Sequence, residues 1–454
     1  MGTLIQWITD NAISCVLTYE IRSLLLSHIP MLLKRLDERI AVGGFFDHSH
    51  PKPALEGVGN HMLNQYRDVH VIREVAPFKV DGLAIPYPEF IARLYNFCME
   101  LGFRKGLIMP SRAFCSDENQ GLPIILLTKH FGTFPFNHGR VGGIVAVNRH
   151  GPHSQHGEDL MILQASHVGY DPNSGTYGMY SRPQMIGRCL SDSCGKLIHV
   201  IRPYLEQYLF ARDRIFLLKD GNGNCLITVK NSFIDFVSNP VAQGLVLRLN
   251  NIVAEDRMGI IRPITSGSTT QTYKVSEAFK RRLDDLGYQW RPDGGQSIGN
   301  LLTADLFFFR EDFHETDDSI LLERNLIEFM PDIVSARFPA LRAAKTNIQL
   351  EFARVVESIR RSEDYKGRSL LYIAGLNIDI SENEELPVMN YFVPWAAHVQ
   401  LKDGTPATYT HPIEQDALYA KLMAQSPDNL DQIDLKENIR RILRAPRLDI
   451  RSSK

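Results

Sequence analysis

Three short segments of the sequence contain side chains that bind metal ions or act as nucleophiles in many proteins. They are Cys115-Ser116-Asp117-Glu118, Ala165-Ser166-His167-Val168-Gly169 and Ser191-Asp192-Ser193-Cys194-Gly195. Two cysteine thiolates and one imidazole are suitable ligands for Zn²⁺, and three protein ligands leave the fourth tetrahedral position open, as in catalytic zinc sites. The residue types therefore make Cys115, His167 and Cys194 candidate ligands of one zinc ion.

Other interpretations of these residues stay open at this point. Free cysteines are among the most buried residue types, and the candidates are too far apart in sequence for a compact motif such as C-x-x-C. His167 could equally be a core histidine whose hydrogen bonds are satisfied. A third interpretation makes Cys115 a nucleophile and His167 its base, as in thiol hydrolases.

Asp117 lies two residues after Cys115 and is the carboxylate that we expect to assist the candidate ligands. Two thiolates neutralise the formal charge of Zn²⁺, so the acidity of a bound water depends on neighbouring groups. Asp117 could accept a hydrogen bond from that water, or it could bind the metal itself and close the site.

Short apolar runs separated by turn residues predict strands in the middle of the chain. The runs are 107–109, 124–127, 144–147 and 160–163. Runs that are apolar on both faces are typical of strands buried on both sides of a sheet. Residues 195–212 follow with helical spacing, and Asp192 or Ser193 could cap that helix. Strands alternating with helices predict an α/β domain with a largely parallel sheet flanked by helices.

This arrangement would bring the three candidate ligands to one edge of the sheet. If 107–109 and 160–163 are parallel strands, Cys115 and His167 lie past their carboxyl ends, where open α/β sheets place their sites. A helix beginning at Gly195 would bring Cys194 to the same edge. The partial positive charge of the helix N-terminus would also lower the pKa of that thiol.

The chain divides into three predicted regions. Residues 1–104 are expected to be helical, 105–264 to form the zinc-binding α/β domain, and 265–454 to form an α+β region of unknown role. The loop 265–272 marks the second boundary because it is rich in Ser, Thr and Gly. Further predicted elements are helices over Ile13–Leu36, Pro88–Leu101, 275–286, 317–361 (interrupted near Pro331 and Pro339) and 435–443, strands over 245–249, 370–374 and 393–399, and a hairpin of 215–218 and 226–229.

Composition and charge exclude several classes of protein. The 454 residues are 44% hydrophobic and 22% charged, which is ordinary for a globular protein. Lys and Arg number 50 and Asp and Glu 52, so no basic excess favours a nucleic-acid partner. No uncharged apolar run approaches the ~20 residues of a membrane helix, and no membrane partner is expected. The first thirty residues carry no secretory signal and the six cysteines are too few for a disulfide scaffold, so we expect a cytoplasmic protein.

Four ordered motifs in the chain resemble those of a known family. They are Cys115-Ser116-Asp117-Glu118, Phe136-Asn137-His138-Gly139-Arg140-Val141-Gly142-Gly143, Ser166-His167-Val168-Gly169 and Cys194-Gly195-Lys196-Leu197. In residue type and order they are similar to the motifs of the limiting-CO₂-inducible B/C proteins, the θ-type carbonic anhydrases, which are relatives of the β class. The resemblance covers about residues 105–210. It implies a β-carbonic-anhydrase-like domain, a zinc ion bound by Cys115, His167 and Cys194 with Asp117 beside it, and a homodimer.

Two features depart from the pattern of the family or leave it ambiguous. The β-type motif Cys-x-Asp-x-Arg would place an arginine where this chain has Asn119. The arginine that orients Asp117 must then come from elsewhere, and Arg140 is the candidate assigned here, with Arg149 as an alternative. Cys189 could replace Cys194 as a ligand, but the Gly195 that opens a helix favours Cys194.

The activity that the resemblance implies is reversible hydration of CO₂ to bicarbonate by a zinc-bound hydroxide, oriented by Asp117. We expect the proton to reach solvent through His138 or His153. CO₂ would occupy an apolar pocket lined by Phe134, Phe136 and Val168. The alternatives are a catalytically silent zinc- or bicarbonate-binding regulatory protein on the same scaffold, with Asp117 fixed on the metal, and a Cys–His thiol hydrolase.

Overall fold

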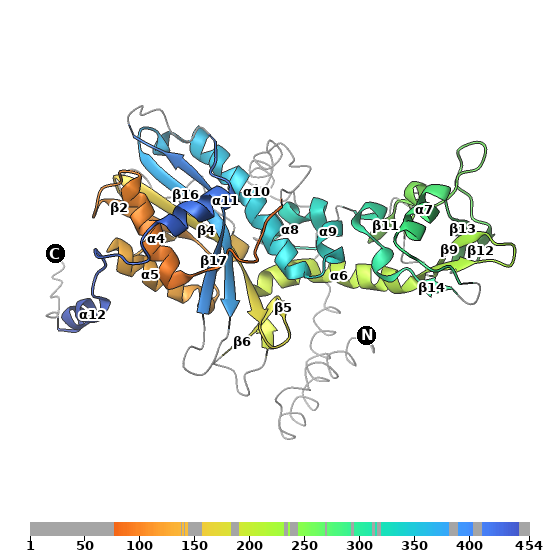
Figure 1. The fold of residues 1–454 in the computed structure, drawn as a ribbon, viewed down its shortest axis with the longest axis horizontal. Coiled ribbons are helices and arrows are strands. Elements are labelled where there is room, and N and C mark those ends of the chain that lie inside the picture. Colours follow the sequence, from red (N-terminus) through yellow and green to blue (C-terminus); the bar gives the residue numbers. More distant parts are fainter. Residues whose placement is uncertain are drawn as a thin grey trace, which may run out of the picture. The chain divides into compact units, whose positions relative to one another are not determined.

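The computed structural model describes most of the chain from residue 77 onward (Figure 1). The described residues are 77–137, 139, 141–143, 157–182, 190–230, 235–236, 244–267, 270–291, 295–310, 314–315, 319–380, 389–402 and 411–444. All of them belong to one compact unit, Val69–Lys454. Some expectations concern positions outside these ranges: the helix over Ile13–Leu36, the strand over 144–147, His138, Arg140, Arg149, His153 and Cys189.

A mixed sheet forms the centre of the α/β fold. Its strands lie in the order β1-β17-β16-β4-β2-β3, and β5 pairs with β4. The strands are β1 (Ile85–Pro86), β2 (Ile108–Ala113), β3 (Phe136–Asn137), β4 (Asp159–Asp171), β5 (Thr176–Tyr177), β16 (Ser369–Ile380) and β17 (Met389–Gln400). Strands β3, β2, β4 and β16 pair in parallel, whereas β17 and β1 join the other edge in antiparallel fashion. The predicted α/β fold is confirmed, with a sheet that is parallel around β4 and antiparallel towards β1.

Helices cover one face of this sheet through a single hydrophobic core. These helices are α4 (Tyr87–Glu100), α5 (Gly121–Phe131) and α11 (Gln415–Ala424). The core joins them to inward-facing residues of the central strands, among them Met161, Leu163 and Ile373. The helix predicted at Pro88–Leu101 is therefore confirmed as α4, and its burial on the sheet explains its apolar spacing.

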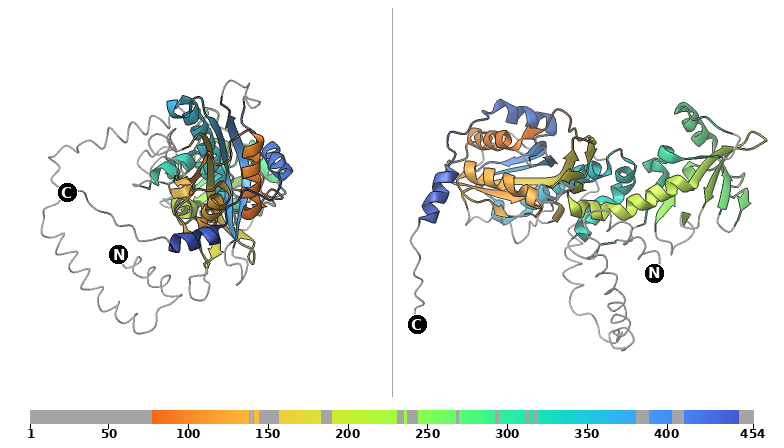
Figure 2. Two further views of the ribbon diagram at one scale, coloured as in Figure 1. Left: turned by 90° about the vertical axis from the view of Figure 1, so that its left-hand side faces the viewer. Right: turned by 90° about the horizontal axis from the view of Figure 1, so that it is seen from below.

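Helix α10 covers the opposite face, as the two further views in Figure 2 make clear. It contacts β4 and β16, and Phe352 of α10 stacks on Tyr372 of β16 with ring centroids 5.2 Å apart. Helices α6, α8 and α9 pack beside it. The bounds are α6 (Gly195–Arg214), α8 (Ile320–Leu326), α9 (Met330–Ser335) and α10 (Pro339–Arg361). Because both faces of the sheet are covered, residues of β4 at adjacent positions are equally buried. This explains why the first part of the strand, residues 160–163, is apolar at every position.

The apolar run at 124–127 belongs to helix α5, so its prediction as a strand was wrong. Leu126, Leu127 and Phe131 are buried, whereas Ile125, the residue just before Leu126, is 55% exposed, as expected on an amphipathic helix. Gly132 ends the helix in a left-handed conformation with φ of 79°. A run of four apolar residues does not by itself distinguish a strand from a buried turn of helix.

A second, smaller sheet contains the predicted hairpin. Its strand order is β12-β13-β9-β8-β14. The elements of this part of the chain are β8 (Ile215–Lys219), β9 (Cys225–Lys230), β12 (Thr265–Ser266), β13 (Thr270–Lys274), α7 (Glu277–Asp285) and β14 (Gln296–Ser297). Strands β8 and β9 pair antiparallel, as predicted. The loop expected at 265–272 instead includes β12 and most of β13, so it lies within a sheet.

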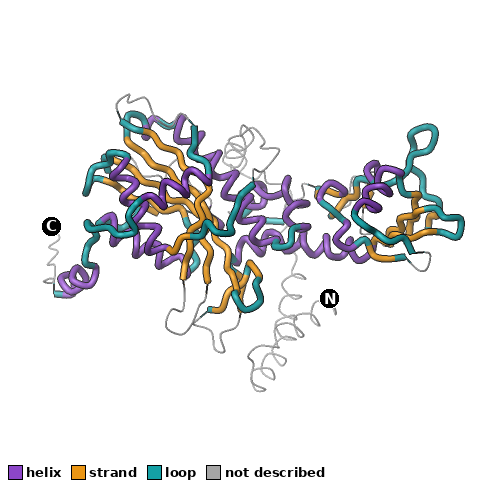
Figure 3. Tube along the Cα trace, viewed as in Figure 1, coloured by secondary structure: helices purple, strands orange, loops and turns teal. Residues whose placement is uncertain are grey.

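Five short strands complete the sheets, and their place among the helices can be followed in Figure 3. They are β6 (Met179–Ser181), which pairs with β7 (Leu190–Asp192), and β11 (Leu245–Leu247), which pairs with β15 (Phe307–Phe309) and with β10 (Asp235–Phe236). The last described helix is α12 (Leu435–Leu443), with the bounds that the sequence predicted.

The central sheet draws strands from all three predicted regions. Strand β1 comes from 1–104, strands β2 to β5 come from 105–264, and strands β16 and β17 come from 265–454. One role of the last region is therefore to complete the sheet beside β4. The three-region division itself stays a prediction, as do the homodimer and the cytoplasmic location. Of the helices described, none is both long and apolar enough to cross a bilayer.

Candidate metal centre

Cys115 lies two residues after the end of β2, at the carboxyl end of a parallel strand, as the sequence predicted. It is 2% exposed. Two glycines of one Gly-rich segment, Gly139 and Gly142, pass close to Cys115 or to the residue before it. A Cβ on Gly139 would lie 2.5 Å from the carbonyl oxygen of Phe114, so only glycine fits there. The backbone N–H of Gly142, a residue with φ of 71°, donates a hydrogen bond to the Cys115 sulfur. The Gly-rich segment thus places a backbone donor against the thiol.

His167 lies inside strand β4, and its predicted position past the end of that strand was wrong. Strand β4 continues to Asp171, four residues beyond His167, and pairs in parallel with β16 so that His167 is level with Asn377. The apolar run at 160–163 is only its first part. The small and polar residues that follow remain in the sheet because β16 continues to pair with β4 as far as Tyr170, although β2 ends level with Gln164. His167 is 1% exposed.

Cys194 is the N-cap residue of α6 and is 1% exposed. It immediately precedes Gly195, the first residue of the 20-residue helix, as the sequence predicted. The preceding Ser193 is also buried, and its backbone carbonyl accepts a hydrogen bond from the N–H of Gly169 in β4. This contact holds the start of α6 against the strand that carries His167.

Four side chains converge at this edge of the sheet. One possible ligand atom from each of Cys115, Asp117, His167 and Cys194 lies within 4.8 Å of all the others. The two sulfur atoms are 3.7 Å apart, and Asp117 Oδ2 lies 3.3 Å from His167 Nε2. Those same two atoms, Oδ2 and Nε2, are buried and have no hydrogen-bond partner within the described part of the chain. Unsatisfied buried polar atoms that point at two thiols are what an ion-binding centre requires.

Two separations within the cluster match those between the ligands of a tetrahedral zinc ion. With Zn–S bonds of ~2.3 Å, two thiolates are ~3.8 Å apart, and with Zn–N and Zn–O bonds of ~2.0–2.1 Å, the nitrogen and oxygen are ~3.3 Å apart. The measured values are 3.7 Å and 3.3 Å. The donor set of two sulfurs, one imidazole nitrogen and one carboxylate oxygen therefore fits Zn²⁺ in both chemistry and spacing.

The electrostatics of the cluster favour a thiolate on Cys115. The hydrogen bond from the Cys194 thiol and, to a lesser extent, the neighbouring His167 lower the pKa of Cys115 to about 3, against the opposing effect of burial. The same contact with Cys115, together with burial, raises the pKa of Cys194. Burial lowers the pKa of His167, but the neighbouring Cys194, Asp379 and Cys115 raise it overall. A metal ion bound here would displace the protons of Cys194 and His167.

Asp117 differs from the other three side chains because it is partly accessible. Its side chain is 25% exposed. Burial raises the pKa of Asp117, the His167 charge lowers it, and the neighbouring Cys115 raises it again. The charge of Arg182 also lowers this pKa, so Arg182 is an arginine close enough to act on Asp117. Arg182 is held by an ion pair with Glu118 and by a hydrogen bond from its Nε to the Ser191 hydroxyl at 2.6 Å.

Asp379 of β16 holds His167 in position through a hydrogen bond, and the sequence analysis did not identify it. It is fully buried, and its Oδ2 accepts a hydrogen bond from His167 Nδ1 at 2.8 Å. The carboxylate also accepts hydrogen bonds from the side chains of Asn119 (2.7 Å), Ser193 (3.1 Å), Gln120 (2.9 Å) and Asn390 (2.6 Å). Because Nδ1 donates its proton to Asp379, the other ring nitrogen, Nε2, faces the two thiols.

The sequence pattern around Asp379 indicates a strand but not the contact that Asp379 makes. Asn377 and Asp379 alternate with apolar residues at the end of the run that begins at Leu370. Such alternation indicates a strand with one polar face. It does not indicate that this polar face meets His167, because that contact joins residues 212 positions apart.

The remaining expectations have mixed outcomes. Phe134 is 77% exposed, so the interpretation of it as a lining residue of a buried CO₂ pocket was wrong; three residues beyond the end of α5, it lies on the surface. Val168 is buried and Phe136 is half-buried. Arg140, His138, His153 and Cys189 lie outside the described residues.

No protein-family model matches the chain, and no curated protein matches it. Among solved structures, the chain is similar to a crystal structure of PtLCIB4, described as a homologue of the limiting CO₂-inducible protein LCIB. The identity is 11%, the match covers 73% of this chain and 95% of that chain, and the TM-score is 0.40. A crystal structure of the limiting CO₂-inducible protein LCIB matches with 10% identity over 74% of this chain and 95% of that chain, with a TM-score of 0.36. The assignment of the metal centre rests on the contacts described above.

Proposed function

We propose that the chain is a zinc-dependent enzyme of the carbonic anhydrase type, which hydrates CO₂ reversibly to bicarbonate. The observation that carries the proposal is the convergence of Cys115, Asp117, His167 and Cys194, with an S–S and an N–O separation that suit a tetrahedral zinc ion. Sulfur ligands disfavour Mg²⁺ and Ca²⁺, which prefer oxygen. When bound, Zn²⁺ acts as a Lewis acid that brings the pKa of a water molecule towards ~7.

The four side chains of the cluster have different roles in the proposed reaction. Cys115, Cys194 and His167 are almost fully buried and hold their positions, the last through its hydrogen bond to Asp379. Asp117 is the partly exposed member, so it is the one that can move without repacking the core. In the described position Asp117 Oδ2, 3.3 Å from His167 Nε2, would serve as a fourth ligand of a bound ion. Turned towards solvent, the Asp117 carboxylate would be free to accept a hydrogen bond from the reacting water and to orient it towards CO₂.

The test is metal content together with CO₂ hydration for the full chain. We expect one zinc ion per chain and a hydration rate above that of buffer. Cys194→Ser should lose both, because a hydroxyl is a poor ligand compared with a thiolate. Cys98→Ser serves as the matched control, since Cys98 is also fully buried but lies in α4, away from the cluster. Zinc content near zero in the purified protein, or unchanged hydration in Cys194→Ser, would contradict the proposal.

A second candidate is a catalytically silent zinc-binding regulatory protein. The observation that favours it is the position of Asp117, whose Oδ2 is already 3.3 Å from His167 Nε2. If the carboxylate stays on the metal, no vertex is open to water. Zinc bound at one ion per chain without hydration activity up to pH ~9 would support this function instead. In that case Asp117→Ala should create activity, whereas in the enzyme it should reduce activity while the zinc stays bound.

A thiol hydrolase uses some of the same contacts. Cys115, His167 and Asp379 are linked in the order nucleophile, base and orienting carboxylate. That function does not account for Cys194 and Asp117, which complete the cluster. Alkylation of Cys115 distinguishes the two, because zinc should block the reagent if both thiols are ligands and should leave the reaction unchanged if Cys115 acts as a free nucleophile.

A further inference from the structure

Helix α12 carries an apolar side that faces solvent. With about 100° of rotation per residue, Leu435, Ile439, Ile442 and Leu443 fall on one side of the helix. The last three are 54%, 71% and 80% exposed, and no residue of the helix is buried. The helix is stabilised at its start by Asp434, whose side chain accepts a hydrogen bond from the N–H of Glu437 at 3.0 Å. Its apolar side is thus not used in folding the described part of the chain.

The other side of the helix is strongly basic. Lys436, Arg440, Arg441 and Arg444 lie there, and the one acidic residue, Glu437, is paired with Arg441 at 3.2 Å and Arg440 at 3.9 Å. The sequence continues with further cations, so residues 436–454 contain seven basic and two acidic residues. The whole chain has 50 basic and 52 acidic residues, so the basic excess is local to this segment.

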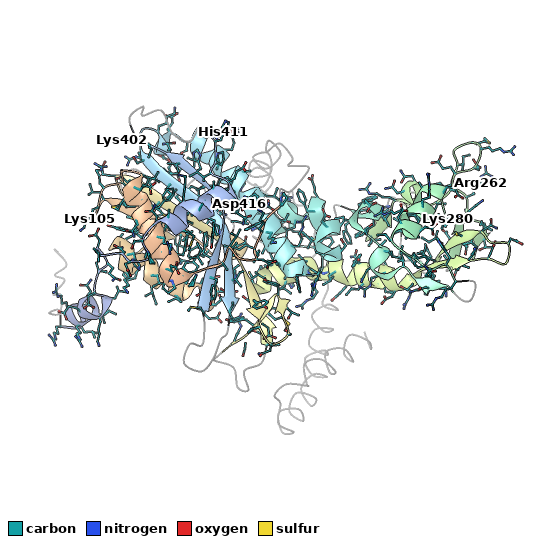
Figure 4. All side chains as sticks on the ribbon, viewed as in Figure 1. Lys105, Arg262, Lys280, Lys402, His411 and Asp416 are labelled. Carbon is teal, nitrogen blue, oxygen red and sulfur yellow. The ribbon has the colours of Figure 1, made fainter. Side chains whose placement is uncertain are left out.

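The segment before α12, residues 429–433, makes hydrogen bonds and an ion pair with the α/β domain. The N–H of Ile433 donates to the carbonyl oxygen of Lys129 at 2.9 Å, and the side chain of Asn429 contacts that of His130 at 3.0 Å, both near the end of α5. An ion pair joins Asp431 to Lys105, which Figure 4 shows at the same side of the molecule as α12. The helix therefore begins two residues after Ile433, the last of these attachment points.

Two more apolar side chains are exposed close to this attachment. Leu430, next to Asn429, is 98% exposed, and Phe134, two residues after Gly132, is 77% exposed. The side chain of Ile433 lies 4.0 Å from the position of a Cβ on Gly132, so the start of α12 and the end of α5 are in contact. Exposed aromatic and aliphatic side chains near a basic amphipathic helix are typical of proteins that bind at the surface of a membrane.

We propose that α12 binds the surface of a bilayer that contains anionic phospholipids. Its apolar side enters the boundary between headgroups and acyl chains, while Lys436, Arg440, Arg441 and Arg444 contact the lipid phosphates. Charge complementarity favours an anionic bilayer as the partner of α12. The apolar side of the helix is bordered by cations, and an anionic bilayer has an apolar layer beneath a negatively charged surface. A nucleic acid would use the cations only. Although none of the described helices can span a bilayer, a surface helix does not need to, because it lies in the plane of the membrane.

The experiment is co-sedimentation of the full chain with vesicles of phosphatidylcholine, with or without phosphatidylserine, at about 0.1 M salt. We expect binding to the vesicles that contain phosphatidylserine and a decrease as salt is raised. The double variant Ile442→Ser/Leu443→Ser should lose most of the binding. Loss of each charge in Arg440→Gln and Arg444→Gln should weaken it about fivefold. All four side chains are exposed, so these variants should fold normally.

The matched control is Met258→Ser combined with Arg262→Gln, which removes one exposed apolar and one exposed basic side chain elsewhere (Figure 4). It should bind like the unaltered chain. Equal sedimentation with and without phosphatidylserine would overturn the proposal, as would unchanged binding of the Ile442→Ser/Leu443→Ser variant. A smaller molecular mass of that variant in light scattering would also overturn it and would identify a second copy of the chain as the occupant. None of these results depends on zinc or on CO₂ hydration.

Discussion

Asp379 determines which nitrogen of His167 is available to a metal ion. It is fully buried and accepts hydrogen bonds from His167 and from several amide and hydroxyl donors. A carboxylate in this position fixes both the ring orientation and the proton on Nδ1, and it makes the ring a stronger ligand. The candidate centre therefore depends on a residue that would not itself touch a bound ion.

The substitution Asp379→Asn tests this dependence. The amide keeps the shape of the side chain but replaces one acceptor oxygen with a donor that faces the donors of Asn119 or Gln120. We expect zinc affinity to fall about 10- to 100-fold and the free energy of unfolding to fall by about 1–3 kcal/mol. Competition with a chromophoric chelator measures the first and urea unfolding the second.

The control for this substitution is Asp256→Asn, in an exposed turn where the carboxylate accepts hydrogen bonds only from nearby backbone N–H groups and faces Arg262. It should leave zinc affinity unchanged. An Asp379→Asn protein that binds zinc as tightly as the unaltered chain would show that His167 is oriented by something else.

Residue types in the sequence predicted three of the side chains that converge in the candidate centre, but not the carboxylate of Asp379 that supports them. Cys115, His167 and Cys194 could be selected because few side chains bind zinc and each lies beside a predicted strand or helix end. Asp379 could not be selected in the same way, since carboxylates are common and its contact with His167 spans 212 positions. The type of a residue is a local property, whereas the pairing of β16 with β4 depends on the whole sheet.

At the scale of elements, helices with a clear start were predicted better than short apolar runs. Helix α12 has the predicted bounds, and α6 extends only two residues beyond its prediction. The run at 124–127 became part of α5, and the run at 160–163 became the first third of β4. A cap or a helical period identifies an element over many residues, but four apolar residues fit a strand or a buried helical turn equally well.

Helix α5 also carries a titratable side chain in the contact that precedes α12. His130 is 6% exposed, and its Nδ1 accepts a hydrogen bond from Asn429 at 3.0 Å. Burial and, to a lesser extent, the charge of the adjacent Lys129 lower the pKa of His130 to about 4. In the unfolded chain this pKa is about 6.5. Between these values the unfolded state binds a proton that the folded state excludes, so stability present above pH ~6.5 is lost as the pH falls towards ~4.

We therefore expect acid to destabilise the fold partly through His130. The loss should be on the order of 1–3 kcal/mol between pH ~7 and pH ~4.5, and His130→Gln should show a shallower decrease because the proton-binding site is gone. Urea unfolding at several pH values measures this. The substitution His411→Gln, at an exposed histidine (Figure 4), should follow the unaltered chain. Parallel curves for His130→Gln and the unaltered chain would rule out this contribution.

At the scale of the whole molecule, the candidate metal centre joins elements that are far apart in sequence. Cys115 follows β2, His167 lies in β4, Cys194 begins α6, and Asp379 of β16 supports them. Two of the three predicted regions thus contribute to one site. The sequence did not reveal this because the 265–454 region shows no motif, and its role becomes visible only in the pairing of β16 with β4.

A ligand that joins so many elements should stabilise the folded chain. An ion that binds the folded state and not the unfolded state adds about 2.7 kcal/mol at a hundredfold excess over its dissociation constant. We expect urea unfolding in zinc to require more denaturant than unfolding in a chelator. Cys194→Ser should abolish the difference, whereas Cys98→Ala, a change at a buried cysteine of α4, should lower stability in both conditions and keep the difference. If the unaltered chain unfolds identically with zinc and with chelator, the four side chains do not form a metal centre, whatever activity the protein has.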